Sequence, residues 1–306
     1  MTMKTLLLTG ASGFIGKNIS LYFSKKFRLL TPSHQQLDLL DAKAVSDYVK
    51  KNKVDYIIHT ANIGGSQNQT NTKNIIDINL RMFFNIIHNI DLVERIIYFG
   101  SGAEYDKRKP IVSVKEEKFG QNIPGDDYGF YKYICSQYTQ RLNSKKLICL
   151  RLFGVYGPHE NYLIRFISNA IVKNLLHLKI KINQNVNFDY LYVNDLNLVL
   201  NYFLHHNPKH YIYNVCSGTK TSLLDIANKI NQLSNYHSKI TIINKGLNNE
   251  YTASNSRLIN EVKNLKITTI EQGIKTLLDW YNENLDLLNK KEIINDKYAN
   301  LCVVKK

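Results

Sequence analysis

The sequence predicts an α/β protein in which a doubly wound parallel sheet carries a smaller α/β lobe towards the C-terminus. The first observation is that short apolar runs alternate with segments of helical periodicity through the first half of the chain. This alternation is typical of parallel strands joined by crossover helices. The second observation is that the alternation loosens from about residue 157, which indicates a separate lobe.

Each apolar run of the first half is followed by a helical pattern. The runs that predict strands are residues 4–10, 27–31, 54–61, 95–102 and 147–157. The patterns that predict helices are residues 14–25, 41–52, 75–90 and the segment around Tyr128. The less regular second half predicts a helix near 162–175, sheet and helix segments at 188–205 and 211–218, and a helix at 269–285. Loops that follow parallel strands meet at the carboxyl edge of the sheet, where ligands bind.

Composition and charge exclude several classes of protein. The 306 residues are 44% hydrophobic and 11% aromatic, as in ordinary globular proteins, and no run approaches the roughly 18 apolar residues of a membrane-spanning helix. The net charge is +15, but the lysines are scattered and form no basic stripe interleaved with aromatic residues, so we expect no nucleic-acid partner. We expect a cytoplasmic protein without a signal-cleavage pattern.

The four cysteines do not suggest a metal site. They stand at positions 135, 149, 216 and 302, without Cys-x-x-Cys or Cys/His ligand spacing. Three of them lie in apolar surroundings that predict core positions. We therefore expect neither a disulfide framework nor a bound metal.

A glycine-rich turn, TGASGFIG at residues 9–16, directly follows the first predicted strand and opens a helix. Glycines at 10, 13 and 16 allow a sharp turn and let a pyrophosphate approach the helix N-terminus, where free N–H groups and the helix dipole favour an anion. In this strand-turn-helix context the motif predicts a Rossmann-type dinucleotide site. Without a ligand it would be an ordinary glycine-rich turn.

A domain division follows from this motif. Residues 1–155, together with about 188–212, are expected to form the dinucleotide-binding domain. Residues 156–187 and 213–282 are expected to form the substrate-binding lobe. The segment 283–306 is a Lys/Asn-rich tail without a usable motif.

The catalytic candidates are Ser101, Tyr128 and Lys132. Tyr128 and Lys132 are four residues apart in a predicted helix and so share a face. The same spacing occurs at Tyr22/Lys26 and Tyr105/Lys109. Only Tyr128 opens a helix soon after a strand that delivers a serine, Ser101, to the ligand edge, although Ser101 alone could be a turn residue. We expect the Lys132 ammonium to lower the phenol pKa of Tyr128, so that Tyr128 exchanges a proton while Ser101 polarises the substrate oxygen.

At this point the chain resembles the extended short-chain dehydrogenase/reductases, specifically the nucleotide-sugar members of the NAD-dependent epimerase/dehydratase family. The resemblance spans roughly residues 4–282. Its motifs are TGASGFIG, Ser101, Tyr128/Lys132, VDYIIHTA, INLRMFFNII, LRLFGVYGP, FDYLYVNDL, YNVCSGTKTSLLDIA and TIEQGIKTLLDWY. It implies a nucleotide cofactor in the N-terminal domain, a nucleoside-diphosphate sugar held by the lobe, and a homodimer built through the long helices of the sheet domain.

The resemblance also implies which residues touch the cofactor. They are Gly10, Ser12, Gly13, Phe14, Ile15, Gly16, Ser33, His34, Asp38, Leu39, Thr60 and Ala61, together with Tyr128 and Lys132. NAD-preferring members place an acid at the end of the second strand, where this chain reads TPSHQQ. Ser33 and His34 could donate to a 2'-phosphate, so we favour NADPH over NADH although the usual arginine is missing. Asp38 could equally cap the following helix.

Departures from the family pattern narrow the reaction. Dehydratases carry an acid at the position of Ala103, and Glu104 is one residue out of register, so dehydration is not expected. The segments 31–61 and 156–162 resemble those of 4-keto sugar reductases, including GDP-fucose synthase, whose epimerising cysteine also matches Ala103. We therefore expect reduction of the C4 ketone of a nucleoside-diphosphate 4-keto-6-deoxy sugar, with a GDP-sugar slightly favoured. A C4-epimerase is the main alternative, and a catalytically idle dinucleotide-binding protein is a second.

The expected substrate residues are Gly102, Ala103, Phe153, Arg165 and Arg257. The two arginines are assigned to the diphosphate because forked guanidinium donors suit phosphate oxygens. Either could equally be a surface salt-bridge residue.

Overall fold

The computed structural model describes residues 3–64, 73–296, 298 and 304–305. Its main element is a six-stranded sheet of order β10-β6-β4-β3-β1-β2, with every neighbouring pair parallel. The strands are β1 (Thr5–Thr9), β2 (Arg28–Leu30), β3 (Tyr56–His59), β4 (Arg95–Ser101), β6 (Leu147–Leu152) and β10 (Ile212–Val215). The predicted α/β fold with a doubly wound parallel sheet is confirmed.

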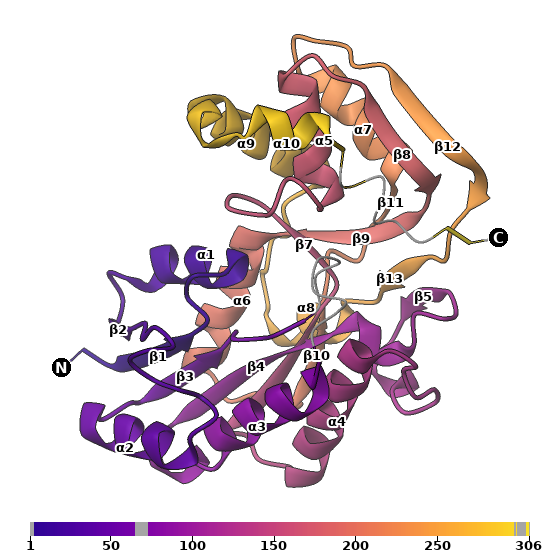
Figure 1. Ribbon diagram of the computed structural model, residues 1–306. Helices are drawn as coiled ribbons and strands as arrows, with labels where there is room; N and C mark the ends of the chain where they lie inside the picture. The colour runs from indigo at the N-terminus through magenta and orange to yellow at the C-terminus, as the bar shows by residue number, and fades with distance from the viewer. Residues whose placement is uncertain (1–2, 65–72, 297, 299–303, 306) are drawn as a thin grey trace.

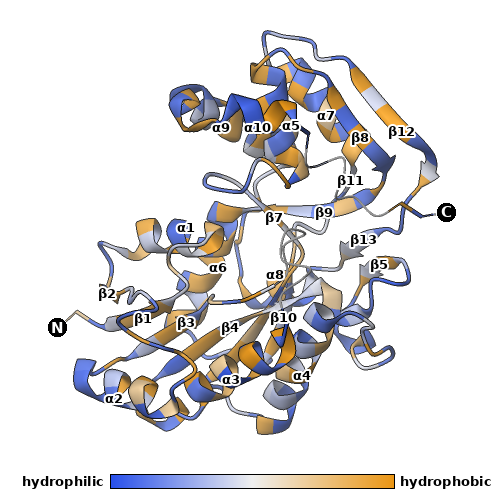
Figure 2. Cartoon of the chain, in the orientation of Figure 1, coloured by the Kyte–Doolittle hydropathy of each residue, from blue (hydrophilic) through white to orange (hydrophobic). Residues whose placement is uncertain are grey.

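Helices cover both faces of this sheet, as Figure 1 shows. Successive side chains of β1 point to opposite faces: Leu6 and Leu8 enter one apolar core and Leu7 enters the other. The first face is covered by α1 (Phe14–Phe23), α6 (Val193–His205) and α8 (Ser256–Glu261). The second is covered by α2 (Ala42–Asn52), α3 (Ile75–Ile87) and α4 (Asp127–Leu142). The strands are therefore apolar on both faces, as Figure 2 shows for the orange strands between the helices.

The lobe is built around a second apolar core. Its helices are α5 (Phe166–Leu175), α7 (Leu223–Leu233), α9 (Ile270–Glu283) and α10 (Lys290–Ile294), beside the pair β8 (Ile180–Asn185) and β12 (Ile240–Leu247). A third sheet, of order β11-β9-β13-β5, lies between lobe and main sheet in Figure 1. Its strands are β5 (Ile111–Val114), β9 (Asn187–Tyr192), β11 (Lys220–Ser222) and β13 (Tyr251–Ala253), and β7 (Gly154–Tyr156) pairs with β9.

Several boundaries differ from the sequence expectations. The run expected as one strand at 147–157 is β6 and β7, which belong to different sheets. The segment 188–205 is strand β9 followed directly by helix α6. Residues 212–215 and helix α8 pack with the six-stranded sheet, so a division at residue 212 cuts through elements of the sheet domain. Among the described residues, no helix combines the length and apolar character needed to cross a membrane.

Candidate active site

The glycine turn joins β1 to α1 at the carboxyl edge of the sheet. Gly10 has φ +70°, which favours glycine, and a Cβ there would lie 2.6 Å from the Ala61 nitrogen. A Cβ at Gly16 would overlap the Gly10 carbonyl oxygen. Gly10 and Gly16 therefore let the strand, the turn and the helix pack closely together.

Gly13 has a different role, because it is the N-cap of α1 and its surroundings are open. A Cβ at Gly13 would meet only the Gly10 oxygen, at 3.5 Å. No side chain caps α1, and its first turn carries no acidic residue. The N-terminal N–H groups and the helix dipole are thus left for an anion, which fits the pyrophosphate of a dinucleotide. Ser12, Phe14 and Ile15 belong to this same turn and first helical residues.

Thr60 and Ala61 follow β3 and hold the glycine turn from the adjacent strand. The Thr60 hydroxyl donates to the Thr9 oxygen at 2.7 Å and reaches the Gly10 oxygen at 3.2 Å. The Ala61 N–H donates to the Thr9 hydroxyl oxygen at 3.3 Å. The hydroxyl of Thr60 is therefore engaged in shaping the turn.

The residues that were expected to contact the adenosine part of the cofactor lie after β2. The His34 side chain is 81% exposed, with its Nδ1 3.8 Å from the Asp38 carboxylate. Asp38 accepts from the Leu40 N–H at 2.9 Å, and the Leu39 oxygen accepts from Asn85. Asp38 thus stabilises its own turn; the helix cap considered for it is instead made by Asp41. The Ser33 N–H donates to Gln36.

Ser101 is the last residue of β4 and begins the 3-10 helix η3 (Gly102–Tyr105). Its hydroxyl oxygen accepts from the Ala103 N–H at 3.1 Å, and its own N–H donates to Glu104 at 2.8 Å. These two bonds form a capping box that fixes the serine at the strand end.

Helix α4 brings Tyr128 and Lys132 to the same place. Its N-cap, Asp126, accepts from the Gly129 N–H at 2.9 Å and sets the helix start one residue before Tyr128. A hydrogen bond with Ser101 acts to lower the pKa of the Tyr128 phenol, so the two hydroxyls adjoin. The Lys132 ammonium donates to the Phe99 carbonyl at 2.6 Å.

The expected lowering of the Tyr128 pKa by Lys132 does not decide the direction of the shift, because the pKa is raised and Lys132 is not among its main causes. Burial, the largest cause, raises the pKa of the Tyr128 phenol above its usual value, while Ser101 and the charge of Arg165 act in the opposite direction. Lys132 lies 5.9 Å from the Tyr128 ring centroid and points at Phe99 instead. Burial also lowers the pKa of Lys132 to about 8. Burial therefore affects the pKa of each group more than the other group does from one helical turn away.

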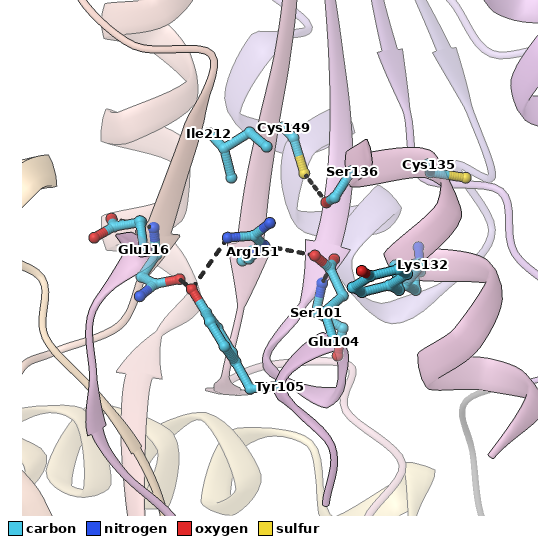
Figure 3. Close-up of polar contacts among 12 residues, drawn as sticks. Ser101, Glu104, Tyr105, Glu116, Lys132, Cys135, Ser136, Cys149, Arg151 and Ile212 are labelled. Atoms are coloured by element: carbon cyan, nitrogen blue, oxygen red, sulfur yellow. Dashed lines mark hydrogen bonds and ion pairs between the residues drawn. The ribbon is translucent and has the colours of Figure 1, made fainter. Parts of the chain in front are cut away.

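A buried polar network lies behind Ser101, and Figure 3 shows it. Glu104 and Arg151 are both 0% exposed and form an ion pair at 2.5 Å. Arg151 also donates to the Tyr105 hydroxyl at 3.1 Å, and Tyr105 donates to Asn214 of β10 at 2.8 Å. Glu104 does point away from the reaction site, although its segment is a 3-10 helix rather than extended. It therefore supports the serine backbone and is not placed to act as a dehydratase acid.

Three expected substrate residues adjoin Ser101. Gly102 and Ala103 follow it in η3, and Ala103 is 1% exposed. Phe153 follows β6, and a Cβ on Gly102 would lie 2.6 Å from its ring. The small residues thus let the aromatic ring approach the strand end.

The structure places the two arginines that were expected to bind the diphosphate in different surroundings. Arg165 is an exposed N-cap residue of α5, and its positive charge acts to lower the pKa of Tyr128. Arg257 needs a correction. Its guanidinium donates to the Ile212 oxygen at 3.1 Å and to Glu117 at 2.5 Å, with Glu116 3.8 Å away. These carboxylates engage Arg257 at the edge strand β10, so it is a salt-bridge residue.

One residue at this site was not predicted from the sequence. The Tyr251 hydroxyl lies 2.5 Å from where a Gly102 Cβ would be, and a hydrogen bond with Ser101 acts to lower its pKa. Tyr251 reaches the site from β13, far along the chain from the other members. With 20 tyrosines in the chain and no local motif around Tyr251, the sequence holds no signal for it.

Comparison with known proteins agrees with this geometry. Residues 6–216 match the model of the NAD dependent epimerase/dehydratase family. The chain belongs to this family. Membership confirms the resemblance found in the sequence and makes the chain an NAD(P)-dependent oxidoreductase.

Relatives of the chain include several nucleotide-sugar enzymes. A GDP-L-colitose synthase of Yersinia pseudotuberculosis is 36% identical over 107 residues, about a third of each chain (33% and 35%). A GDP-L-fucose synthase of Dictyostelium discoideum is 24% identical over 94% of this chain and 98% of its own. A solved GDP-L-fucose synthetase of Naegleria fowleri, bound to NADP, has a TM-score of 0.81 at 20% identity, covering 95% of this chain and 96% of its own.

Proposed function

We propose that the chain reduces the C4 ketone of a nucleoside-diphosphate 4-keto-6-deoxy sugar with NADPH. The observation that carries this proposal is that the Ser101 and Tyr128 hydroxyls adjoin at the carboxyl end of β4, on the same edge of the sheet as the glycine turn with its open Gly13. The related synthases act on GDP-linked sugars by name, and a structural neighbour at TM-score 0.77 is a GDP-6-OMe-4-keto-L-xylo-heptose reductase. A GDP-sugar is therefore the first substrate to test.

The protonation states favour reduction over oxidation. Because burial raises the pKa of Tyr128, the phenol is protonated at neutral pH and can serve as the acid. A bound reduced nicotinamide supplies the hydride to C4 of the sugar. Tyr128 gives its proton to the ketone oxygen, and Ser101 donates a hydrogen bond to that oxygen as negative charge develops. The charge of Arg165 stabilises the resulting phenolate.

The residues at positions 103 and 104 support simple reduction. Ala103 stands where a dehydratase carries its acid, and Glu104 is held by Arg151. Ser33 and His34 follow β2 and are exposed, which supports NADPH as the cofactor. The kcat/KM for NADPH divided by that for NADH measures this preference. We propose that the enzyme works in the cytoplasm, in the synthesis of surface-polysaccharide sugars.

The test is consumption of NADPH in the presence of a GDP-4-keto-6-deoxy sugar, followed by the absorbance of the reduced nicotinamide. The product should gain two hydrogens by mass spectrometry. Tyr128→Phe should lower kcat by about 10²–10⁴-fold, because the proton donor is lost, while NADPH binding persists. Tyr22→Phe, a phenol of α1 with the same spacing to a lysine, is the matched control and should keep its activity.

Two outcomes contradict the proposal. Interconversion of two nucleotide sugars without net loss of NADPH would identify a C4-epimerase instead. No turnover with GDP-, UDP- or dTDP-linked ketones, combined with tight dinucleotide binding, would identify a protein that binds the cofactor without catalysis.

A further inference from the structure

We infer that Glu104 is a positioning residue for the reaction, and that its task is to supply a hydrogen-bond acceptor to the backbone of Ser101. One oxygen of its carboxylate accepts from the Ser101 N–H at 2.8 Å, and the other accepts from Arg151 at 2.5 Å. All three residues are buried (Figure 3). The inference rests on the proposed function for its kinetic test, but not for its amide-exchange test.

The Glu104 side chain folds back onto the strand that carries Ser101, and Gly100 makes room for it. A Cβ at Gly100 would lie 2.5 Å from the Glu104 carboxylate and 3.0 Å from the Arg151 side chain. Gly100 and Arg151 are paired neighbours on β4 and β6. The carboxylate therefore lies against the end of β4, within hydrogen-bond distance of the Ser101 N–H.

Side chains of β6 and β10 hold the other end of the carboxylate. Arg151 donates to Glu104 and, at 3.1 Å, to the Tyr105 hydroxyl oxygen. The proton of Tyr105 is directed to the Asn214 side-chain oxygen at 2.8 Å, and the Asn214 amide donates to the Val114 oxygen at 3.0 Å. Each donor and acceptor in this chain has one direction. The carboxyl ends of β4, β6 and β10, which are neighbours in the sheet, are thereby linked by side chains.

The two charges of this network are a poor source of stability. Glu104 and Arg151 are both 0% exposed, so both lose the water that would surround them in the unfolded chain. The Nη2 atom of Arg151 is buried and has no hydrogen-bond partner in the described part of the chain. Replacing such a pair by apolar side chains of similar volume is often neutral or stabilising. The contribution of Glu104 is therefore geometric, and it lies in the acceptor offered to Ser101.

The position of the Ser101 hydroxyl depends on this backbone bond. The capping box that holds the Ser101 N–H at Glu104 also holds the hydroxyl oxygen at the Ala103 N–H, 3.1 Å away. A backbone fixed in this way preorganises the hydroxyl for the ketone oxygen, on which negative charge develops. Without the acceptor, the buried Ser101 N–H would be unpaired, and the strand end would move to find another partner.

Two double variants separate the acceptor from the charges. The acceptor-keeping variant, Glu104→Gln with Arg151→Met, removes both charges and leaves an amide oxygen for the Ser101 N–H. The acceptor-free variant, Glu104→Leu with Arg151→Met, removes both charges and the acceptor. Neither leaves an unpaired buried charge, so both should fold.

The kinetic test compares these two variants with the wild type. The acceptor-keeping variant should lose less than about 3-fold in kcat, because the Ser101 N–H remains paired. The acceptor-free variant should lose about 10-fold or more in kcat, while the KM of NADPH changes less than about 2-fold. A merely structural role would give the two variants the same kcat.

The test without turnover measures hydrogen exchange of the Ser101 amide by NMR, in protein labelled with ¹⁵N-serine. Ser101→Ala assigns the resonance by its loss. The wild type and the acceptor-keeping variant should protect this amide, and the acceptor-free variant should exchange it about 10-fold faster or more. The control is Asp296→Asn, which breaks an ion pair with the buried Lys173 in the lobe. It should change neither kcat nor the exchange of the Ser101 amide.

Specific results overturn the inference. Full kcat in the acceptor-free variant, or equal losses in the two double variants, would show that the reaction does not need the acceptor. An unprotected Ser101 amide in the wild type refutes the hydrogen bond itself, and this measurement needs neither double variant to fold. If the wild type reduces no sugar but exchange differs between the two double variants as expected, the proposed function fails and the positioning of Ser101 stands.

Discussion

At the scale of single residues, Glu160 in the lobe is a carboxyl group that the reaction does not use. Its side chain is buried and accepts from the Ser168 hydroxyl at 2.7 Å. Burial raises the pKa of Glu160 to about 7, against the opposing effects of Arg165 and Ser168. The folded protein therefore holds a proton at Glu160 in a pH range where the unfolded chain has released it.

This proton makes the stability of the fold depend on pH. From pH 4.5 to 7 the folded state binds more protons at Glu160, so its contribution to the free energy of unfolding falls as pH rises. Glu160→Gln should match the wild type at pH 4 and exceed it by roughly 3 kcal/mol at pH 8. Urea denaturation at the two pH values measures the difference. Glu283→Gln, at an exposed position of α9, should show no such change. If the free energy of unfolding of Glu160→Gln varied with pH as much as that of the wild type, the prediction would be refuted.

The candidate catalytic residues show which features of a site can be predicted from the sequence. Spacing and position relative to the strands predict Ser101, Tyr128 and Lys132 as catalytic residues; in the structure Ser101 and Tyr128 adjoin, whereas the Lys132 ammonium donates to the Phe99 carbonyl. The direction of the Tyr128 pKa shift is set by burial, and the Lys132 ammonium is directed to the Phe99 carbonyl. Neither quantity can be derived from a spacing of four residues.

At the scale of elements, the glycine turn assigns separate roles to its glycines. Gly13→Ala should leave the melting temperature within about 2 °C of the wild type, because φ is −77° and the Cβ meets only one atom at 3.5 Å. It should weaken NADPH binding about 10-fold or more, because a methyl group enters the space left for the pyrophosphate. Fluorescence titration with NADPH measures the affinity.

Gly16→Ala is the matched comparison for this turn. Its Cβ would overlap the Gly10 oxygen, so we expect a loss of roughly 1–3 kcal/mol in the free energy of unfolding. Equal effects of the two substitutions on thermal unfolding would show that Gly13 is also a packing glycine.

Elements of the first half were predicted well because each is specified locally. The apolar run and glycine turn of residues 4–16 give β1 and α1, and the Tyr128 segment gives α4. The strands β5 and β13 have only four and three residues and pair across the chain, so their signals are weak in the sequence. Tyr251 was missed for this reason, since its place depends on pairing with Phe188 and Ile111.

At the scale of the whole molecule, the helices α3 and α4 carry a partly exposed groove. This groove is lined in part by Phe84, Ile134 and Tyr138, which remain partly exposed. We propose that the homodimer implied by the family resemblance forms on this surface. Ile134→Glu should shift the mass in solution from dimer to monomer, because a charge is costly in an apolar interface. Light scattering after size exclusion measures the mass, with Leu21→Glu on the exposed face of α1 as control. A wild-type monomer, or a dimer unaffected by Ile134→Glu, would contradict this.

The place of β10 in the sheet has a consequence for biosynthesis. β6 is finished at residue 152, yet its neighbour β10 begins only at residue 212. The covering helix α6 also comes late, at residues 193–205. At ribosomal rates of about 5–20 residues per second, the growing polypeptide waits several seconds with one edge of β6 unpaired. Such edges invite intermolecular pairing, so nascent chains stalled in this interval should be the ones that chaperones retain.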